Sequence, residues 1–505
     1  MKKYFTLLFS IFITGTALAQ SSFLDPSFGS GGIVITPPPM ATVYSSGGFS
    51  AVAMQPDNKI IAVGTADEYV IVAKYNEDGT LDSTFGVDGI FKGGPTYSGA
   101  SALAFQPDGK IVIAGGAASV TLDDDFLIIR LNTDGSLDNT FGSSGMVSVR
   151  FTAGNDIGYA LALQPNGKIV IAGQTNGNYV CMARLLTDGE PDSSFGTNGL
   201  VIISSHAGAA NSVAIMSDSR IVIGCEEAPV AFMAIRCLSD GTLDTSFNHT
   251  GVASSNAGTG GFNYCTAMQL QPDNKIVLAG SGTFGTGSSD FTLIRYDTDG
   301  TLDRSFGDTG VTNVDFNGND DNATALYLEP GGKFVVAGYA IVTINENFAL
   351  SRINNNGGID SAFGNNGRIT TAIQDSNDRS LTVTGQPDGK IILAGWSYNS
   401  SRMGVGHDPT LARYLDNTVS VPNIVNIDDH FLCPNPTTGT LNIKGTITHI
   451  ISITASDILG NQIPVNTDLP NHEIFTGNIA NGVYFFKISS DDHPPDVQKI
   501  IIQNK

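Results

Sequence analysis

Short apolar runs alternate with tight turns along most of this chain. In residues 101–149, the runs SALAFQ, KIVIAGG, DFLIIRLN and GMVSV are separated by Pro-Asp-Gly, Thr-Asp-Gly and the segment LDNTFGSSG. Runs of this length between Gly, Pro and Asp turns predict four antiparallel strands, here named A to D in chain order. One such sheet cannot bury both of its faces alone, so copies must pack on one another, as in a propeller or an array.

The same unit recurs seven times. The phenylalanine of the LDxxFG segment occurs at Phe28, Phe85, Phe141, Phe195, Phe247, Phe306 and Phe363. The basic residue after the A–B turn occurs at Lys59, Lys110, Lys168, Arg220, Lys275, Lys333 and Lys390. The basic residue late in strand C occurs at Lys74, Arg130, Arg184, Arg236, Arg295, Arg352 and Arg413. Seven four-stranded units predict an all-β fold, a seven-bladed β-propeller.

The two ends of the repeat region complement each other. Residues 23–36 hold an LDxxFG segment and a strand D without A, B or C, whereas residues 380–416 hold A, B and C without D. We expect the N-terminal strand to join the last blade, because this closes the ring and removes its open edges. The alternative is an open solenoid, which the matched fragments disfavour.

Residues that recur in every unit are best explained as scaffold. Asp138 is placed to accept backbone N–H bonds in its turn, Phe141 to fill space within or between blades, and Gly145 to adopt positive φ before strand D. Arg130 lies near Asp138 in the unit, which predicts a repeated ion pair. Catalysis needs one constellation of residues rather than seven, so these positions are poor candidates for an active site.

The unit resembles the delta-60 repeat family, whose signature is close to LDxxFGxxG, QPDGKIxxAG and RYxxDG. The resemblance covers residues 23–416, with departures at 216–220, at Phe247-Asn248 and at 329–332. It implies a propeller, and it carries no defined activity or catalytic residues.

The N-terminus predicts export. Lys2 and Lys3 precede an apolar run over residues 4–14, and Ala17-Leu18-Ala19 forms a small-residue site, so we expect a signal peptide cleaved after Ala19. The run is too short for a transmembrane helix, and we expect no membrane span in a soluble mature chain. The predicted organisation is a signal peptide at 1–19, a propeller at 20–416, a linker at 417–430 and a final domain at 431–505.

The final domain has its own texture of short strands and turns, which predicts a small β-sandwich. It resembles the C-terminal sorting domain of the type IX secretion system of Bacteroidetes. The matching residues include the following: Pro434, Asn435, Pro436, Gly482, Tyr484 and Lys499. The resemblance implies that the type IX secretion machinery is a partner and that the chain is secreted across the outer membrane, to be released or anchored at the cell surface.

The net charge of the chain limits the classes of partner that it can bind. The chain has 505 residues and a net charge of −22, and most of its 26 Lys and Arg belong to the repeated positions above. The B–C and D–A connections vary in length and should share one face, where fifteen acidic residues stand against only four basic residues: Lys92, Arg150, Arg379 and Arg402. An acidic face repels phosphate backbones, so we expect no nucleic-acid partner. Glycans or protein ligands fit better, and we expect a monomer.

The candidate binding residues lie in these variable connections. Asp123, Asp124 and Asp125 form one acidic cluster, and Asp320 and Asp321 belong to another. Carboxylates of this kind could hold Ca²⁺, but solvated acidic loops are the favoured explanation, so we predict no metal and no cofactor. Trp396 and Tyr398 could stack on sugar rings or serve equally as packing residues.

Catalytic signals are weak. No G-x-S-x-G or H-E-x-x-H sequence is present, and the five cysteines form no C-x-x-C pair, so we expect buried thiols, with a Cys225–Cys265 disulfide as the alternative. We therefore expect a surface-displayed binding or adhesion module and lean against an enzyme. A secreted hydrolase or lyase acting on polysaccharide, and a purely structural surface protein, remain alternatives.

Overall fold

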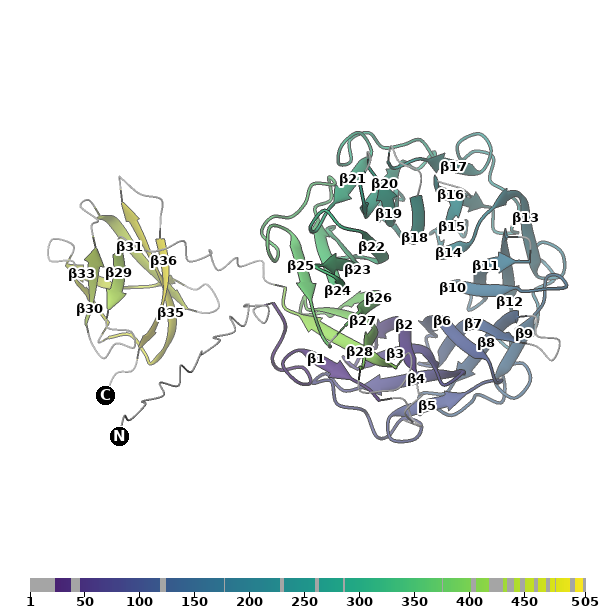
Figure 1. Ribbon diagram of the computed structural model, residues 1–505, viewed down its shortest axis with the longest axis horizontal. Coiled ribbons are helices and arrows are strands. Elements are labelled where there is room, and N and C mark those ends of the chain that lie inside the picture. Colours follow the sequence, from purple (N-terminus) through teal and green to yellow (C-terminus); the bar gives the residue numbers. More distant parts are fainter. Residues whose placement is uncertain are drawn as a thin grey trace, which may run out of the picture. The chain divides into compact units, whose positions relative to one another are not determined.

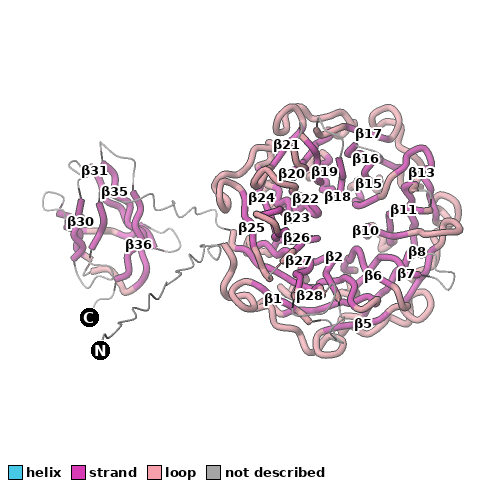
Figure 2. The backbone as a smooth tube through the Cα atoms, in the orientation of Figure 1, coloured by secondary structure: helices cyan, strands magenta, loops and turns pink. Residues whose placement is uncertain are grey.

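The computed structural model describes residues 23–37, 46–118, 124–176, 178–227, 231–258, 263–284, 287–374, 376–400 and 406–416, and parts of 430–502. The chain divides into two compact units, Met1–Val419 and Ser420–Lys505. Every regular element in the described residues is a β-strand (Figure 2). Within that part of the chain, no helix has the length and apolar character needed to cross a membrane.

The described residues of the first unit form seven four-stranded antiparallel sheets, arranged around a common centre (Figure 1). Sheet 1 holds β2 (Gly47–Met54), β3 (Ile60–Ala66), β4 (Tyr69–Tyr75) and β5 (Ile90–Gly93); sheet 2 holds β6 (Ser98–Phe105), β7 (Ile111–Ala118), β8 (Asp124–Leu131) and β9 (Met146–Val149). Sheet 3 holds β10 (Ile157–Leu163), β11 (Ile169–Thr175), β12 (Tyr179–Leu185) and β13 (Leu200–Ala207); sheet 4 holds β14 (Ala210–Ile215), β15 (Ile221–Glu227), β16 (Ala231–Cys237) and β17 (Val252–Ser255). Sheet 5 holds β18 (Asn263–Leu270), β19 (Ile276–Thr283), β20 (Ser289–Tyr296) and β21 (Val311–Val314); sheet 6 holds β22 (Asp321–Leu328), β23 (Phe334–Val342), β24 (Asn345–Ile353) and β25 (Arg368–Thr371). Sheet 7 holds β26 (Asp378–Gly385), β27 (Ile391–Tyr398), β28 (His407–Tyr414) and β1 (Ile33–Ile35).

The N-terminal strand completes the last of these sheets. β1 pairs antiparallel with β28, and Ile33 lies opposite Ala412. The Thr36 hydroxyl, just after β1, lies 2.5 Å from the Tyr75 hydroxyl in sheet 1. The predicted pairing of the two chain fragments is therefore confirmed, because β1 supplies the strand D that the last repeat lacks.

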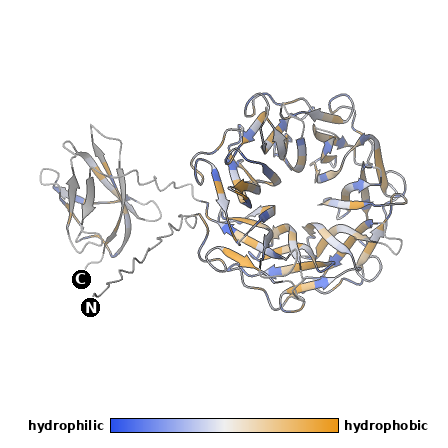
Figure 3. Ribbon diagram, viewed as in Figure 1, coloured by the Kyte–Doolittle hydropathy of each residue, from blue (hydrophilic) through white to orange (hydrophobic). Residues whose placement is uncertain are grey.

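The hydrophobic core lies between neighbouring sheets. Strands B and C are almost fully buried, as in β3 and β4. One apolar cluster joins Ile61 and Val72 of sheet 1 to Ile111 and Ile129 of sheet 2, and similar clusters join other neighbours. Figure 3 shows hydrophobic positions along the strands of these sheets. A four-stranded sheet thus buries both faces only through its neighbours, as the repeat predicts.

The Ala-Gly pair in strand B has a steric cause. Each strand A carries a register shift near its start, as between Cys265 and Ala267. The backbone of strand A there approaches strand B so closely that a Cβ on Gly280 would lie 1.7 Å from the Tyr264 carbonyl oxygen. In five other sheets, a Cβ on the equivalent strand B glycine would lie 1.9–2.0 Å from the corresponding strand A carbonyl oxygen. These glycines are Gly64, Gly115, Gly173, Gly338 and Gly395.

The repeated polar residues form the predicted scaffold. Arg130 Nε lies 2.7 Å from Asp138 Oδ2, and its guanidinium carbon lies 4.4 Å from the centre of the Phe141 ring. Arg130 Nη1 also donates to the carbonyl oxygen of Thr187 in the next repeat. Asp138 Oδ1 accepts the backbone N–H of Thr140 at 3.0 Å. The ion pair and the turn hydrogen bond are therefore confirmed, and the arginine additionally links neighbouring sheets.

Gly145 and its equivalents adopt the predicted positive φ, at values between 86° and 107°. The repeated phenylalanines are at most 1% exposed. Four cysteines are buried: Cys181, Cys225, Cys237 and Cys265. Burial raises the pKa of Cys237 to about 12 and raises that of Cys181 and Cys265 as well, which keeps these thiols protonated and unreactive.

The second unit contains two four-stranded antiparallel sheets among its described residues, in the orders β29-β30-β34-β33 and β32-β31-β35-β36. Their strands are β29 (His430–Cys433), β30 (Thr440–Gly445), β31 (Ile450–Asp457), β32 (Gln462–Ile463), β33 (Asn466–Asp468), β34 (Glu473–Phe475), β35 (Gly482–Ser490) and β36 (Asp496–Ile502). One apolar cluster includes Leu441 and Ile474 from the first sheet and Phe486 and Ile500 from the second. Two sheets over one core are the arrangement of a β-sandwich.

Candidate functional site

The B–C and D–A connections meet on one side of the first unit, which we call the loop face. Contacts between the start of a strand C and the following D–A connection show this meeting: Asp156 N donates to Asp124 O at 2.7 Å, and Ser289 N donates to Asp320 Oδ1 at 2.9 Å. These connections differ in length and sequence while the strands beneath them are nearly uniform. Variable loops on a rigid scaffold are the usual place for binding residues.

The cationic residues of the loop face are engaged by its own carboxylates. The described residues of this face form three ion pairs: Lys92 with Asp67 at 3.3 Å, Arg150 with Asp125 at 2.9 Å, and Arg379 with Glu346 at 2.7 Å. The fourth cation assigned to this face, Arg402, lies outside the described residues. Because the available cations are paired, the other carboxylates of this face determine its field.

Three of those carboxylates converge between sheets 5 and 6. One oxygen each from Asp290, Asp315 and Asp321 lies within 4.8 Å of the other two. Asp290 and Asp321 are buried and Asp315 is exposed. Asp290 Oδ2 accepts a hydrogen bond from Asn313 at 2.9 Å, and Asp321 Oδ2 accepts the backbone N–H of Phe316 at 2.8 Å. The Oδ1 atoms of Asp290 and Asp321 are buried and have no hydrogen-bond partner among the described residues.

The negative charges of this cluster are unfavourably placed, because two of its carboxylates are buried and all three lie close together. Burial, with the negative charges of Asp290, Asp315 and Asp320, raises the pKa of Asp321 to about 7. Burial is also the main cause of a raised pKa at Asp290. A carboxylate moved from water to a buried site keeps its charge only when a hydrogen-bond donor or a cation compensates for it. The cluster therefore favours a proton or a bound cation.

The acidic residues predicted from the sequence separate in the structure. Asp123 lies outside the described residues, Asp124 begins β8, and Asp125 is paired with Arg150. Asp320 accepts a hydrogen bond from the backbone N–H of Ser289, whereas Asp321 belongs to the three-carboxylate cluster. The two predicted clusters therefore lie in different parts of the fold, and Asp321 alone among these residues enters the cluster described above.

An aromatic group lies on the loop face at sheets 6 and 7. Trp396 stacks on His407, with ring centres 4.0 Å apart and planes 27° apart, and Tyr398 meets the same imidazole edge-on at 5.9 Å. The Arg379 guanidinium lies 4.5 Å from the Tyr339 ring and 5.5 Å from the Trp396 ring. Burial and the nearby Arg379 lower the pKa of His407. All five side chains are partly exposed.

The two charged residues at the start of β26, Asp378 and Arg379, are engaged in structural contacts. Asp378 is fully buried and accepts the backbone N–H groups of Ile373 and Gln374 at 2.7 and 3.2 Å. Arg379 forms the bidentate pair with Glu346. Neither residue therefore offers a free charge at the starts of the strands A.

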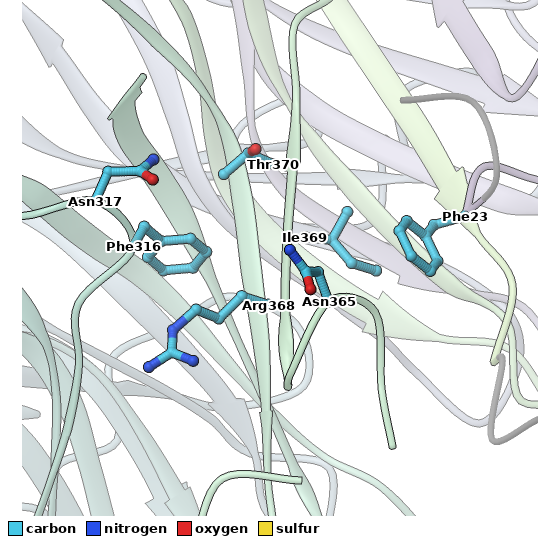
Figure 4. Close-up of a pocket in the computed structure, with 7 residues that line it drawn as sticks. All are labelled: Phe23, Phe316, Asn317, Asn365, Arg368, Ile369 and Thr370. Atoms are coloured by element: carbon cyan, nitrogen blue, oxygen red, sulfur yellow. The ribbon is translucent and has the colours of Figure 1, made fainter. Parts of the chain in front are cut away.

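A pocket of about 250 Å³ lies along strand β25 of sheet 6 (Figure 4). Its walls combine Phe316 and Asn317, from the connection that precedes β22, with Arg368 and Ile369 of β25 and with Phe23 near the N-terminus. The backbone N–H of Phe316 also donates a hydrogen bond to Asp321 Oδ2, so this pocket adjoins the three-carboxylate cluster.

The predicted sorting residues fall in the second unit. Gly482 and Tyr484 belong to β35, and Lys499 belongs to β36, where it pairs with Phe485. The Tyr484 ring lies in the core, and its hydroxyl donates to the Ala480 carbonyl oxygen at 3.0 Å. Three further predictions lie outside the described residues: Pro434, Asn435 and Pro436, and so does the predicted cleavage site after Ala19.

Sequence reasoning missed Asp290, Asp315 and Arg379 as site residues. Asp290 occupies the position in β20 that Asp125 occupies in β8, since Phe291 and Phe126 follow them in equivalent registers. A position-by-position comparison of the seven repeats would have exposed Asp290, but the sequence holds no signal that it meets Asp315 and Asp321.

Two family models match the chain. The model "Domain of unknown function (DUF5122) beta-propeller" matches residues 55–85, 106–141, 164–195, 271–306 and 386–415. The model "Secretion system C-terminal sorting domain" matches residues 432–503. The first set of matches omits the fourth and sixth repeats, where the unit departs from its signature at residues 216–220 and 329–332.

Comparison with solved structures finds similarities of low sequence identity. Virginiamycin B lyase from Staphylococcus aureus has a TM-score of 0.44 and 13% identity, over 76% of this chain and 98% of that one. The polysaccharide lyase Uly1 has a TM-score of 0.39 and 11% identity, over 75% and 92%. Sqt1 from Chaetomium thermophilum, bound to the N-terminus of the ribosomal protein L10, has a TM-score of 0.39 and 12% identity, over 72% of this chain and 87% of that one. No curated protein matches the chain.

The fold and the family models together define the class: this is a secreted β-propeller protein with a sorting tail. More particularly, the chain carries DUF5122 beta-propeller repeats, similar to delta-60 repeats, and a C-terminal sorting domain of the type IX secretion system. That domain directs the protein to the cell surface or the extracellular space by type IX secretion. The resemblances inferred from the sequence are thus confirmed.

Proposed function

We propose that the propeller is a closed ring of seven blades that spans residues 20–416, followed by a linker at 417–430 and the sorting domain at 431–505. Contacts between sheet 7 and sheet 1 support closure. Gly29, in the segment that completes sheet 7, donates its N–H to Asp78 O at 2.8 Å, and Arg413 donates to the carbonyl oxygen of Glu77. The same two kinds of contact join other neighbouring sheets, as between Gly86 and Asp134.

The function that this geometry supports best is binding or adhesion at the cell surface through the loop face. The observation that carries this proposal is the partly exposed aromatic group, in which Trp396, Tyr398 and His407 gather beside Tyr339 and Arg379. Aromatic faces stack on the apolar faces of sugar rings and contribute large contact areas at low entropic cost. Neutral glycans are the ligand class, because the rest of the loop face is acidic and repels anions.

A glycan array probed with the purified protein tests this function. We expect binding to a subset of neutral glycans without turnover, with affinity reduced at least about tenfold in Trp396→Ala or Tyr398→Ala, as for truncation of a residue that carries much of the binding energy. Tyr97→Ala is the matched control, because Tyr97 is 60% exposed and lies outside the aromatic group. Its affinity should equal that of the wild type.

Three results would contradict the proposal. Equal affinity of Trp396→Ala and the wild type, in a variant that melts normally, would place the ligand elsewhere. Absence of any ligand would favour a purely structural surface protein. Release of shorter sugar products during incubation would instead show a polysaccharide hydrolase or lyase.

A further inference from the structure

Two corners of the loop face have the same construction. One lies between sheets 2 and 3 and the other between sheets 5 and 6. In each, a phenylalanine of strand C packs on a phenylalanine of the next D–A connection: Phe126 on Phe151 at 4.9 Å, and Phe291 on Phe316 at 5.0 Å. The registers Phe126–Val149 and Phe291–Val314 make the positions around these pairs equivalent.

The equivalence extends to individual hydrogen bonds. Asn155 Oδ1 accepts the N–H of Asp124, and at the same position Asp320 Oδ1 accepts the N–H of Ser289. A strand D side chain also donates to the strand C aspartate in both corners: Ser148 to Asp125 at 3.3 Å, and Asn313 to Asp290 at 2.9 Å. The two corners therefore allow a comparison of charge within one molecule.

In the corner between sheets 2 and 3, the negative charges of the aspartates are compensated by partners from the chain. Arg150 Nε donates to Asp125 Oδ1 at 2.9 Å. Asp156 is fully buried and accepts the Phe151 N–H at 2.8 Å and the Thr175 hydroxyl at 2.5 Å. Asp125, which is half-buried, and Asp156 each have a positive or hydrogen-bonding partner from the chain.

The corner between sheets 5 and 6 lacks both partners. Asp315 stands where the first corner has Arg150, one residue before the packed phenylalanine. Ala340, near the end of strand B, stands where the first corner has Thr175, and it lies opposite Asp321 in the ladder. Within the part of the chain that the structure describes, Asp290 Oδ1 and Asp321 Oδ1 are consequently buried without a partner. A third carboxylate occupies the place of the missing guanidinium.

We propose that Asp290, Asp315 and Asp321 bind a divalent cation, which performs in this corner the role that Arg150 performs in the other. The ligands are all carboxylates, which suit Ca²⁺, and opposing oxygens around Ca²⁺ lie about 4.6–5.2 Å apart. The three aspartates place their oxygens within 4.8 Å of one another, so one ion reaches all of them. Asp315 is exposed and provides the route of entry from solvent.

The ion would link β20 of sheet 5 to β22 of sheet 6 across the D–A connection. Because type IX secretion takes the protein out of the cell, the site would fill in a medium where calcium is abundant. Extracellular modules bind Ca²⁺ with Kd of about 10⁻⁴–10⁻³ M, and the same range is expected here. Calcium would then stabilise the loop face after export.

The test is calorimetric titration of chelator-treated protein with CaCl₂, together with thermal melting with and without 10 mM CaCl₂. We expect one saturable site and a rise in Tm of about 1–3 °C in the wild type. Asp315→Arg, which copies the compensated corner, should abolish the calcium-dependent rise and raise Tm in calcium-free buffer. Asp125→Asn is the matched control, and it should bind calcium with wild-type affinity.

Two outcomes would overturn the proposal. One is a wild type that shows neither heat of binding nor a Tm change up to 10 mM CaCl₂, in which case a shared proton compensates for the cluster. The other is Asp315→Arg that binds calcium as tightly as the wild type, which places any calcium elsewhere. Should Asp315→Arg fail to fold, Asp315→Asn decides, because it changes an exposed side chain and should weaken binding at least tenfold.

Discussion

The backbone N–H of Gly29 donates to the carbonyl oxygen of Asp78 at 2.8 Å, joining the first described segment of the chain to the turn after β4. Gly29 follows Phe28, which is fully buried, and Asp25 of the same segment lies 2.8 Å from Arg413 Nη2. The N-terminal segment is therefore part of the core of sheet 7 as well as its outer strand.

Deletion of this segment should be severe. A chain that begins after Thr36 loses β1 and Phe28, leaves Arg413 buried without Asp25, and exposes the edge of β28. Removing one partner of a buried ion pair alone costs about 3–5 kcal/mol, and open edges promote aggregation. We expect aggregation or a large fall in Tm, measured by size-exclusion chromatography and calorimetry. A chain that begins at Phe23 is the control and should behave as the wild type.

Sheet 1 offers a stabilising substitution. Lys74 occupies the strand C position that is arginine in the other six repeats, and its Nζ lies 3.8 Å from Asp82 Oδ2. Lys74→Arg should add a guanidinium bond to Asp82 and one to the Thr133 carbonyl oxygen, the equivalent of the Arg130–Thr187 bond. We expect the free energy of unfolding to rise by about 1–2 kcal/mol in urea melts. Arg130→Lys, the reverse change, should lower it similarly; equal stability of all three proteins would contradict the expectation.

Acid should destabilise the scaffold. Hydrogen bonds from Lys59 and Thr84, opposed by burial, lower the pKa of Asp82 to about 2 from its ordinary value of 3.8. The unfolded chain therefore binds more protons than the folded chain in this window, and the free energy of unfolding should fall as pH falls from about 4 to about 2. Urea melts at each pH measure this. In Asp82→Asn the stability deficit relative to wild type should shrink toward pH 2, and a constant deficit would contradict the assignment.

The strand B glycines should not accept a methyl group. A Cβ on Gly280 would lie 1.7 Å from the Tyr264 carbonyl oxygen, so strands A and B must separate in Gly280→Ala. A backbone clash cannot be relieved by a rotamer change, and we expect a loss of about 3 kcal/mol or more in urea melts. The fourth repeat has Cys225 at this position, and Cys225→Ala should cost less than Gly280→Ala. The opposite order would show that the strands can adjust.

The buried thiols should be inert in the folded protein. Burial raises the pKa of Cys181, Cys237 and Cys265, so little thiolate forms at neutral pH. We expect no iodoacetamide labelling of these residues or of Cys225 in native buffer and full labelling in urea, as measured by peptide mass spectrometry. Labelling of Cys225 and Cys265 in urea only after reduction would instead show the disulfide.

Much of the fold follows from the sequence because the same local pattern of turns and strands occurs in all seven repeats. Turn residues and β-branched runs predict the strands, and positions such as Asp138, Phe141 and Gly145 recur at fixed spacing. Their contacts lie mostly within one unit, so spacing alone places Arg130 beside Asp138. The matched fragments at the two ends likewise predict the pairing of β1 with β28.

The candidate sites depend on the packing of one sheet against the next. Asp290, Asp315 and Asp321 come from a strand C, a connection and the following strand A, and no spacing rule of the unit relates their side chains. The same positions hold Asp125, Arg150 and Asp156 elsewhere, with the opposite electrostatic outcome. The sequence by itself determined the repeated scaffold and the C-terminal sorting domain, because their patterns are local. Only the tertiary structure decided which loop carboxylates share a low-dielectric corner and which ones meet a cation.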